Sequence, residues 1–218
     1  MKTTLLLLTV LFLGSSLQAQ NKQMESQGLV NIKSVDPSIK VALMYARSDN
    51  FCGRTLYADL HDAYMLPRCA QALKKAQAEL KRRRPDLSLC IFDATRPMSI
   101  QQTMWDVVKN TPHYFYVSNP ARGGGMHNYG MAVDITLCTL KGDTLDMGTK
   151  IDYMGKAAHI DHEAALVSAH IISPEARRNR QLLRKVMRHG GFIPLRTEWW
   201  HFNKCSRATA KKYYKVIP

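Results

Sequence analysis

The stretch from Gly123 to Leu137 constrains the fold more than any other part of the chain, because a glycine-rich loop passes directly into a strand there. Its last six residues alternate between small or polar side chains (Ala132, Asp134, Thr136) and apolar ones (Val133, Ile135, Leu137). An alternation with a period of two predicts a β-strand that buries one face in a core. Asp134 then lies on the opposite face, where its carboxylate is available for chemistry.

A histidine precedes this strand at a spacing that requires a turn. His127 lies seven residues before Asp134, and on an unbroken strand an odd spacing would place the two side chains on opposite faces. Gly130 lies between them and can adopt backbone conformations that other residues avoid. We therefore expect the strand to begin near Gly130, and His127 to reach back from the loop toward Asp134.

A second polar segment, residues 197–202 (Thr-Glu-Trp-Trp-His-Phe), could complete a site with this pair. The imidazoles of His127 and His201 and the carboxylate of Asp134 suit Zn²⁺, with a fourth position open for water. Each spacing is common by chance, however, and most histidines in a domain are structural or exposed. A structural role for these residues therefore stays open at this point.

Glu198 and Arg96 are the candidate catalytic side chains around such a metal. Glu198 would act as the general base on water and then pass the proton to the leaving amine. Because it precedes His201 by three residues, a regular strand would separate the two side chains, so we predict a bend or bulge, set by the turn at residues 194–197. Arg96 follows a buried strand and could stabilise a developing oxyanion; a structural pair with Asp93 is the alternative.

The first 19 residues are typical of a secretory signal peptide. Lys2 supplies the charged start, residues 5–13 are apolar, and residues 15–19 form a small-residue cleavage region. A membrane anchor is the alternative, but a membrane span needs about 20 apolar residues. We therefore expect a periplasmic or secreted protein that has no membrane anchor once the signal is removed.

The rest of the chain predicts a single α+β domain, with a small mostly antiparallel sheet and helices packed on one side. Residues 20–34 are expected to form a polar leader, and residues 35–218 the domain itself. Apolar stripes at helical spacing predict the helices, and short apolar runs predict the strands. The predicted helices span residues 67–84, 99–109 and 173–189, and the predicted strands span 87–92, 132–137, 191–194 and 198–203. Strands joined by hairpins, with helices between them, are typical of this class.

The formal net charge of +14 raises the question of a nucleic-acid partner. The Lys and Arg residues are scattered, apart from residues 81–84 and the C-terminal tail, so we expect no nucleic acid. An anionic polymer of the cell envelope, or solubility alone, accounts for the charge. Five cysteines (Cys52, Cys69, Cys90, Cys138, Cys205) include no Cys-x-x-Cys motif, and no disulfide can be assigned from their spacing.

Taken together, these motifs resemble the VanX-type D-alanyl-D-alanine dipeptidases of the wider zinc D,D-peptidase family. That family carries Ser-x-His-x-x-Gly-x-Ala-x-Asp and a later Glu-x-x-His, which align with residues 125–134 and 198–201 here. Residues 45–53, Asp93-Ala-Thr-Arg-Pro97 and residues 146–148 are also similar to the family. The resemblance covers roughly residues 35–203, which is most of the chain after the signal.

The resemblance implies a metal site, a catalytic pair and a substrate. The implied zinc ligands, for one ion per chain, are His127, Asp134 and His201. Glu198 is the implied catalytic base, and Arg96 the implied stabiliser of the transition state. The implied reaction splits the small D,D-dipeptide D-Ala-D-Ala into two D-alanines. Such an enzyme must also hold a free ammonium group; we predict Asp146 for that end, with a turn-capping role as the alternative.

One residue departs from the family pattern. Gly125 stands where the family has a serine, which removes a hydroxyl from the rim of the site and leaves the substrate preference open. The first alternative is a zinc D,D-carboxypeptidase or endopeptidase that acts on peptidoglycan stem peptides and needs an open groove. The second is a non-catalytic, zinc-stabilised envelope-binding module, against which Glu198 argues because a structural site needs no base.

Overall fold

The computed structural model describes residues 21–57 and 59–218, and its centre is a five-stranded mixed sheet in the order β2-β4-β5-β7-β6. The strands are β2 (Lys40–Val41), β4 (Leu87–Asp93), β5 (Ala132–Thr139), β7 (Glu198–Asn203) and β6 (Ile193–Leu195). β2 pairs with β4 in parallel, and the other three pairings are antiparallel. A second, two-stranded antiparallel sheet joins β1 (Val30–Asn31) to β3 (Tyr64–Met65). The predicted α+β class is confirmed, while the main sheet is mixed.

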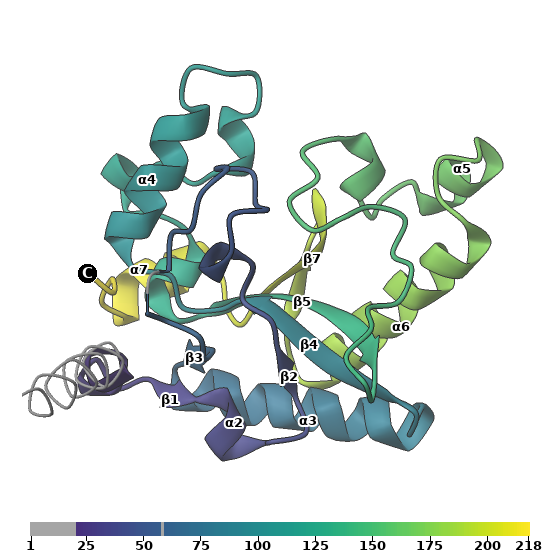
Figure 1. The fold of residues 1–218 in the computed structure, drawn as a ribbon, viewed down its shortest axis with the longest axis horizontal. Coiled ribbons are helices and arrows are strands. Elements are labelled where there is room, and N and C mark those ends of the chain that lie inside the picture. Colours follow the sequence, from purple (N-terminus) through teal and green to yellow (C-terminus); the bar gives the residue numbers. More distant parts are fainter. Residues whose placement is uncertain (1–20, 58) are drawn as a thin grey trace, which may run out of the picture.

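Two long helices cover one face of this sheet. Helix α3 (Pro67–Arg83) begins with proline at its first turn, and α6 (Pro174–His189) is capped by the Ser173 side chain, which accepts a hydrogen bond from the Ala176 amide. The two helices contact each other, and they pack against β4 and β5 respectively. Helix α4 (Met98–Val108) lies on the other side of the sheet (Figure 1), so the prediction that helices occupy one side alone was wrong.

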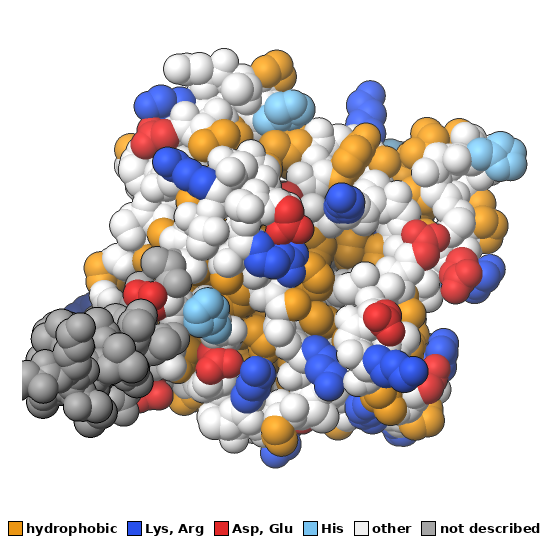
Figure 2. Space-filling view, viewed as in Figure 1, with side chains coloured by type: hydrophobic (Ala, Val, Ile, Leu, Met, Phe, Trp, Pro, Cys, Tyr) orange, Lys and Arg blue, Asp and Glu red, His pale blue; other side chains and the backbone are white. Residues whose placement is uncertain are grey.

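The remaining elements are short. The short α-helices are α2 (Ile32–Val35), α5 (Glu163–Ser168) and α7 (Arg207–Tyr213). The 3₁₀ helices are η1 (Met44–Ala46), η2 (Tyr114–Tyr116), η3 (Pro120–Arg122), η4 (Met126–Tyr129) and η5 (Lys156–Ala158). In the part of the chain that the structure describes, no helix has the length and apolar character needed to cross a bilayer. Lys and Arg side chains are spread over the face shown in Figure 2 rather than gathered in one patch.

Strand β5 is the central strand, and its two faces have different surroundings. Val133, Ile135 and Leu137 are fully buried in a hydrophobic cluster that also contains apolar side chains of α3 and α6. Asp134 and Thr136 are also buried, at 3% and 2% exposure, but on the opposite face. The alternation read from the sequence therefore becomes a dry apolar face toward the helices and a polar face toward a cavity.

The N-terminal residues differ from the loose polar leader that we expected. Residues 21–26 are helical, and β1 pairs with β3. Met24, Leu29 and Ile32 are buried in the main hydrophobic cluster, because their apolar side chains cover its edge. The folded body therefore begins before residue 35. The predicted signal peptide, residues 1–19, lies outside the described residues.

Candidate active site

His127 is placed by a tight turn at the start of β5. It lies in η4, which ends at Gly130 with a φ of 65°, a left-handed conformation that favours glycine. A Cβ at Gly130 would also lie 3.0 Å from a methyl carbon of Leu29. The Nδ1 atom of His127 lies 2.6 Å from the carbonyl oxygen of Ala94, which fixes the ring. The predicted reach of His127 back toward the strand is therefore confirmed, and Gly130 makes it possible.

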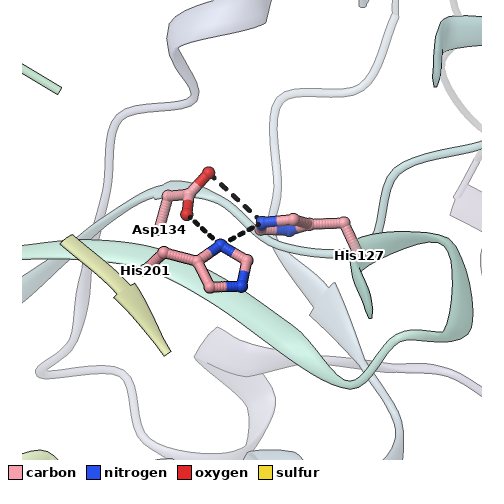
Figure 3. A group of neighbouring side chains, drawn as sticks. All are labelled: His127, Asp134 and His201. Carbon is pink, nitrogen blue, oxygen red and sulfur yellow. Dashed lines mark hydrogen bonds and ion pairs between the residues drawn. The ribbon is translucent and has the colours of Figure 1, made fainter. Parts of the chain in front are cut away.

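Asp134 and His201 are neighbours across the β5–β7 pairing, where they stand directly opposite each other. The Nδ1 atom of His201 lies 3.0 Å from the Oδ1 atom of Asp134, and the Nε2 atom of His127 lies 3.2 Å from Oδ2 of the same carboxylate. The two ring nitrogens are 3.2 Å apart. Figure 3 shows the three side chains pointing toward one another, and all three are buried.

The hydrogen bonds around this cluster show why it suits a cation. A carbonyl cannot donate, so Nδ1 of His127 carries a proton, and in the neutral ring the lone pair lies on Nε2, which faces Asp134. Nε2 of His201 donates a hydrogen bond to Oδ1 of Asn203 at 2.9 Å, so the lone pair of the neutral ring lies on Nδ1. Two neutral imidazoles and one carboxylate then aim their electron pairs at one point. A divalent metal ion removes the repulsion between these atoms, and the donor set fits zinc.

Glu198 lies beside the cluster because β7 is irregular. The pairing jumps from Pro194 opposite Phe202 to Leu195 opposite Glu198, so three residues of β7 bulge out of register. This confirms the predicted bulge between Glu198 and His201. The Oε2 atom of Glu198 is 3.9 Å from Nδ1 of His201. Burial raises the pKa of Glu198 to about 8, so the group holds a proton more readily than an exposed glutamate does.

Arg96 pairs with Asp93, as the structural alternative predicted, and it also lies beside Asp134 at the cavity. Its Nε donates to the Asp93 carboxylate at 2.9 Å, and its Nη1 donates to Gln101 at 3.0 Å. Its Nη2 also lies 3.8 Å from Asp134, and its guanidinium stacks 5.1 Å from the centre of the Tyr45 ring. Arg96 is thus a buried, fully oriented cation at the edge of the group formed by His127, Asp134 and His201 (the metal-type cluster).

These residues surround a single cavity of about 420 Å³. Its lining includes His127, Asp134, His201, Glu198 and Arg96. Such a volume lies at the lower end of the range for small-molecule sites. The cavity therefore brings together five of the six residues that the sequence singled out.

The sixth, Asp146, lies outside this cavity, so our assignment of it to the ammonium end was wrong. Its carboxylate accepts hydrogen bonds from the Gly148 amide at 2.8 Å and from the Ser173 hydroxyl at 2.6 Å. That is the turn-capping role of a short acidic side chain. Asp146 therefore orders the connection to α6 and does not face the candidate site.

Another carboxylate, Asp152, lines the cavity although we did not single it out from the sequence. Tyr45 donates its hydroxyl hydrogen to Asp152 at 2.5 Å, across 107 residues of chain. Burial raises the pKa of Asp152 to about 7. Only the fold brings these two residues together, and no local pattern around Asp152 marks it.

The fold and site define a class: a metal-type cluster of two histidines and one aspartate, with a glutamate beside it, is the arrangement of a metallopeptidase. Within the described residues it is the one group of three or more metal-capable side chains that converge in this way.

Comparison with known proteins specifies the family. The family described as D-ala-D-ala dipeptidase matches residues 25–218, and the chain belongs to this metal-dependent peptidase family. A D-alanyl-D-alanine dipeptidase of Escherichia coli (strain K12) is 33% identical over 179 residues, which cover 80% of this chain and 83% of the relative. One of Enterococcus faecalis (strain ATCC 700802 / V583) is 28% identical over 189 residues, covering 78% and 88%.

Proposed function

We propose that this protein is a zinc-dependent dipeptidase that hydrolyses D-Ala-D-Ala to two D-alanines in cell-wall metabolism. The observation that carries the proposal is the convergence of His127, Asp134 and His201 within 4.8 Å of one another, with Glu198 beside them. A structural zinc site would use four protein ligands, whereas three leave a position for water. The dipeptidase names of the relatives supply the substrate class.

The residues of this chain would divide the reaction between them. A zinc ion held by this donor set supplies Lewis-acid activation of water and of the scissile carbonyl. Glu198 takes a proton from the attacking water as the new C–O bond forms, and gives it to the departing nitrogen as the C–N bond breaks. Burial raises the pKa of Glu198 to about 8 in the metal-free protein, and a zinc ion nearby would lower it toward the range in which one group can both accept and release a proton.

Arg96 would stabilise the oxyanion that develops on the scissile carbonyl. Its guanidinium is already oriented by Asp93 and Gln101, so no reorganisation is needed when negative charge appears. The cation also lies 3.8 Å from Asp134, next to the metal-type cluster where the carbonyl would be activated. Pairing with Asp93 and assistance to the reaction are therefore compatible roles.

Asp152 would bind the ammonium group of the dipeptide. It is the carboxylate that lines the cavity without belonging to the metal-type cluster or acting as the base. The hydrogen bond from Tyr45 holds it in place and favours its ionised form. A charged ammonium brought next to it would favour ionisation further.

The second candidate function is cleavage of peptidoglycan stem peptides by a zinc carboxypeptidase or endopeptidase. The small cavity, about 420 Å³, favours the free dipeptide. The test is the release of D-alanine from D-Ala-D-Ala and from a stem peptide that ends in D-Ala-D-Ala, with zinc present. Cleavage of the free dipeptide supports the proposal, while cleavage of the stem peptide alone moves the protein to the second function. Zinc binding without cleavage of either contradicts both.

Export to the periplasm or the medium is part of the proposal. The support is the charged and apolar sequence of residues 1–19. Expression of the full chain, followed by cell fractionation and N-terminal sequencing, tests it. A protein that retains Met1 and stays in the cytoplasm would contradict export without affecting the proposed chemistry.

A further inference from the structure

Gly125 occupies the position at which the family pattern has a serine, and the structure shows what fills that space. Gly125 lines the cavity, two residues before His127. A Cβ atom added at Gly125 would lie 2.8 Å from Oγ of Ser118 and 3.1 Å from its Cβ. A Cβ atom essentially never lies as close as 2.8 Å to another heavy atom, and 3.1 Å is already a tight contact. A side chain at position 125 would therefore force the Ser118 side chain to move.

Ser118 lines the same cavity from another loop. Its backbone oxygen accepts a hydrogen bond from Gln101 at 2.8 Å, and Gln101 in turn accepts one from Arg96 at 3.0 Å. The position of Ser118 is thus fixed relative to the arginine of the site. Its Oγ atom makes no hydrogen bond to any other residue that the structure describes, so the hydroxyl is available to a ligand.

The charge near Ser118 indicates which part of a dipeptide it would meet. Within the described lining of the cavity, the two cationic side chains are Arg96 and Arg207, and Arg96 is already paired with Asp93. Arg207 donates to the backbone oxygen of Gly124 at 2.7 Å, directly beside Gly125. This part of the wall therefore combines a cation with an available hydroxyl donor, which suits a carboxylate.

We propose that Ser118 supplies the hydroxyl that Gly125 lacks and donates a hydrogen bond to the terminal carboxylate of the bound dipeptide. This inference rests on the proposed function and names a residue that sets substrate binding. The hydroxyl comes from the loop between η2 and η3 instead of the turn before His127. The Ser118 side chain then occupies the space into which a side chain at position 125 would extend.

Ser118→Ala tests the hydroxyl directly. We expect KM for D-Ala-D-Ala to rise about tenfold to hundredfold with kcat nearly unchanged, because a hydrogen bond to a charged group is lost from both ground and transition states. Zinc content and Tm should match those of the wild type. The control is Ser168→Ala, which removes an exposed hydroxyl on α5 that bonds only to its own helix at Ala164. An unchanged KM in Ser118→Ala overturns the proposal.

D-Alanyl-D-alaninamide, used as a competitive inhibitor, tests the assignment to the carboxylate. Its neutral amide is a weaker acceptor than a carboxylate. Its Ki should therefore change less than KM for the dipeptide between the wild type and Ser118→Ala. An equal change for both molecules contradicts contact with the carboxylate.

The replacement of one hydroxyl by the other can be tested by moving the hydroxyl back. Gly125 has an ordinary extended φ of −109°, so a serine there causes no backbone strain. We expect Gly125→Ser alone to raise KM, because the two side chains compete for one space, and Ser118→Gly/Gly125→Ser to recover most of the wild-type KM. A double variant that is worse than both single variants contradicts this replacement. If the wild type itself fails to cleave the dipeptide, the proposed function fails first, so the two failures are distinguishable.

Discussion

The two faces of strand β5 are equally buried, but they are buried in different ways. On the face toward α3 and α6, Val133, Ile135 and Leu137 are buried in the apolar core. On the other face, Asp134 lies against His127 and His201. Burial of apolar side chains stabilises the fold, whereas burial of charged groups costs free energy unless each has a partner.

This difference separates stability from chemistry along a single strand. Every charged group on the polar face has a partner of opposite charge or a donor: Arg96 with Asp93, Tyr57 with Asp93, and Tyr45 with Asp152. In the metal-type cluster, Asp134 faces two imidazoles, and the nearest protein cation, Arg96, lies 3.8 Å from its carboxylate. The apolar face therefore keeps the polar face in position. Substitutions on the apolar face should lower the free energy of unfolding, whereas substitutions of the catalytic groups should lower activity.

The largest effect is expected for Glu198→Gln. Loss of a general base should lower kcat about a hundredfold to ten-thousandfold, while the zinc content stays at the wild-type level because the three ligands are unchanged. D-alanine release and metal analysis measure the two quantities. Glu175→Gln, on the first turn of α6, is the matched control. Wild-type kcat in Glu198→Gln would rule out its role as the base.

Arg96 and Arg180 provide a comparison of two buried arginines. Arg180 donates to the backbone oxygens of Met147 and Ala157 at 2.7 and 3.0 Å and lies outside the cavity lining. We expect Arg96→Lys to lower kcat about a hundredfold, because a lysine cannot reproduce the oriented guanidinium. Arg180→Lys should lower Tm and leave kcat intact. The reverse pattern would show that the two arginines have been assigned the wrong roles.

Leu137→Ala tests the apolar face. The side chain is fully buried, so the substitution should lower the free energy of unfolding by about 2–5 kcal/mol through lost burial and the cavity left behind. Denaturant titration measures the loss. Folded Leu137→Ala should retain the wild-type KM, because Leu137 points away from the cavity. A changed KM without a loss of stability would contradict the separation of the two faces.

Asp152→Asn should show how much the buried carboxylate of Asp152 lowers the free energy of unfolding of the metal-free protein. Burial raises the pKa of Asp152 to about 7, so the folded state binds this proton more tightly than the unfolded state. The wild type therefore loses stability as pH rises from about 4 to 7. The variant avoids this loss and should be more stable above pH 7 by roughly 4 kcal/mol, with little difference near pH 4.

Thermal unfolding of the chelated proteins at the two pH values measures this difference. Asp146→Asn is the control, because Asp146 caps an exposed turn and should bring no gain that depends on pH. A destabilised Asp152→Asn at both pH values would contradict the account of Asp152.

Local sequence patterns predicted how His127 and Asp134 approach each other, while the contact of His201 with them depends on the pairing of β5 with β7. The period of two placed Asp134 on the polar face, and Gly130 allowed His127 to approach. The three-residue spacing of Glu198 and His201 required a bulge, which the structure has. The same reasoning failed for Asp146, since an acidic residue near a glycine fits a turn as well as a binding site. Asp152 and Ser118 could not be found, because their places depend on contacts between distant segments.

The most direct test of the account is a zinc titration of chelated protein with D-Ala-D-Ala as the substrate. We predict that the stripped protein is inactive and that D-alanine release rises with added Zn²⁺ until one equivalent per chain is bound. His201→Ala should fail to bind that equivalent under the same conditions. Full activity in the stripped protein, or tight binding of zinc by His201→Ala, would contradict a catalytic metal held by His127, Asp134 and His201.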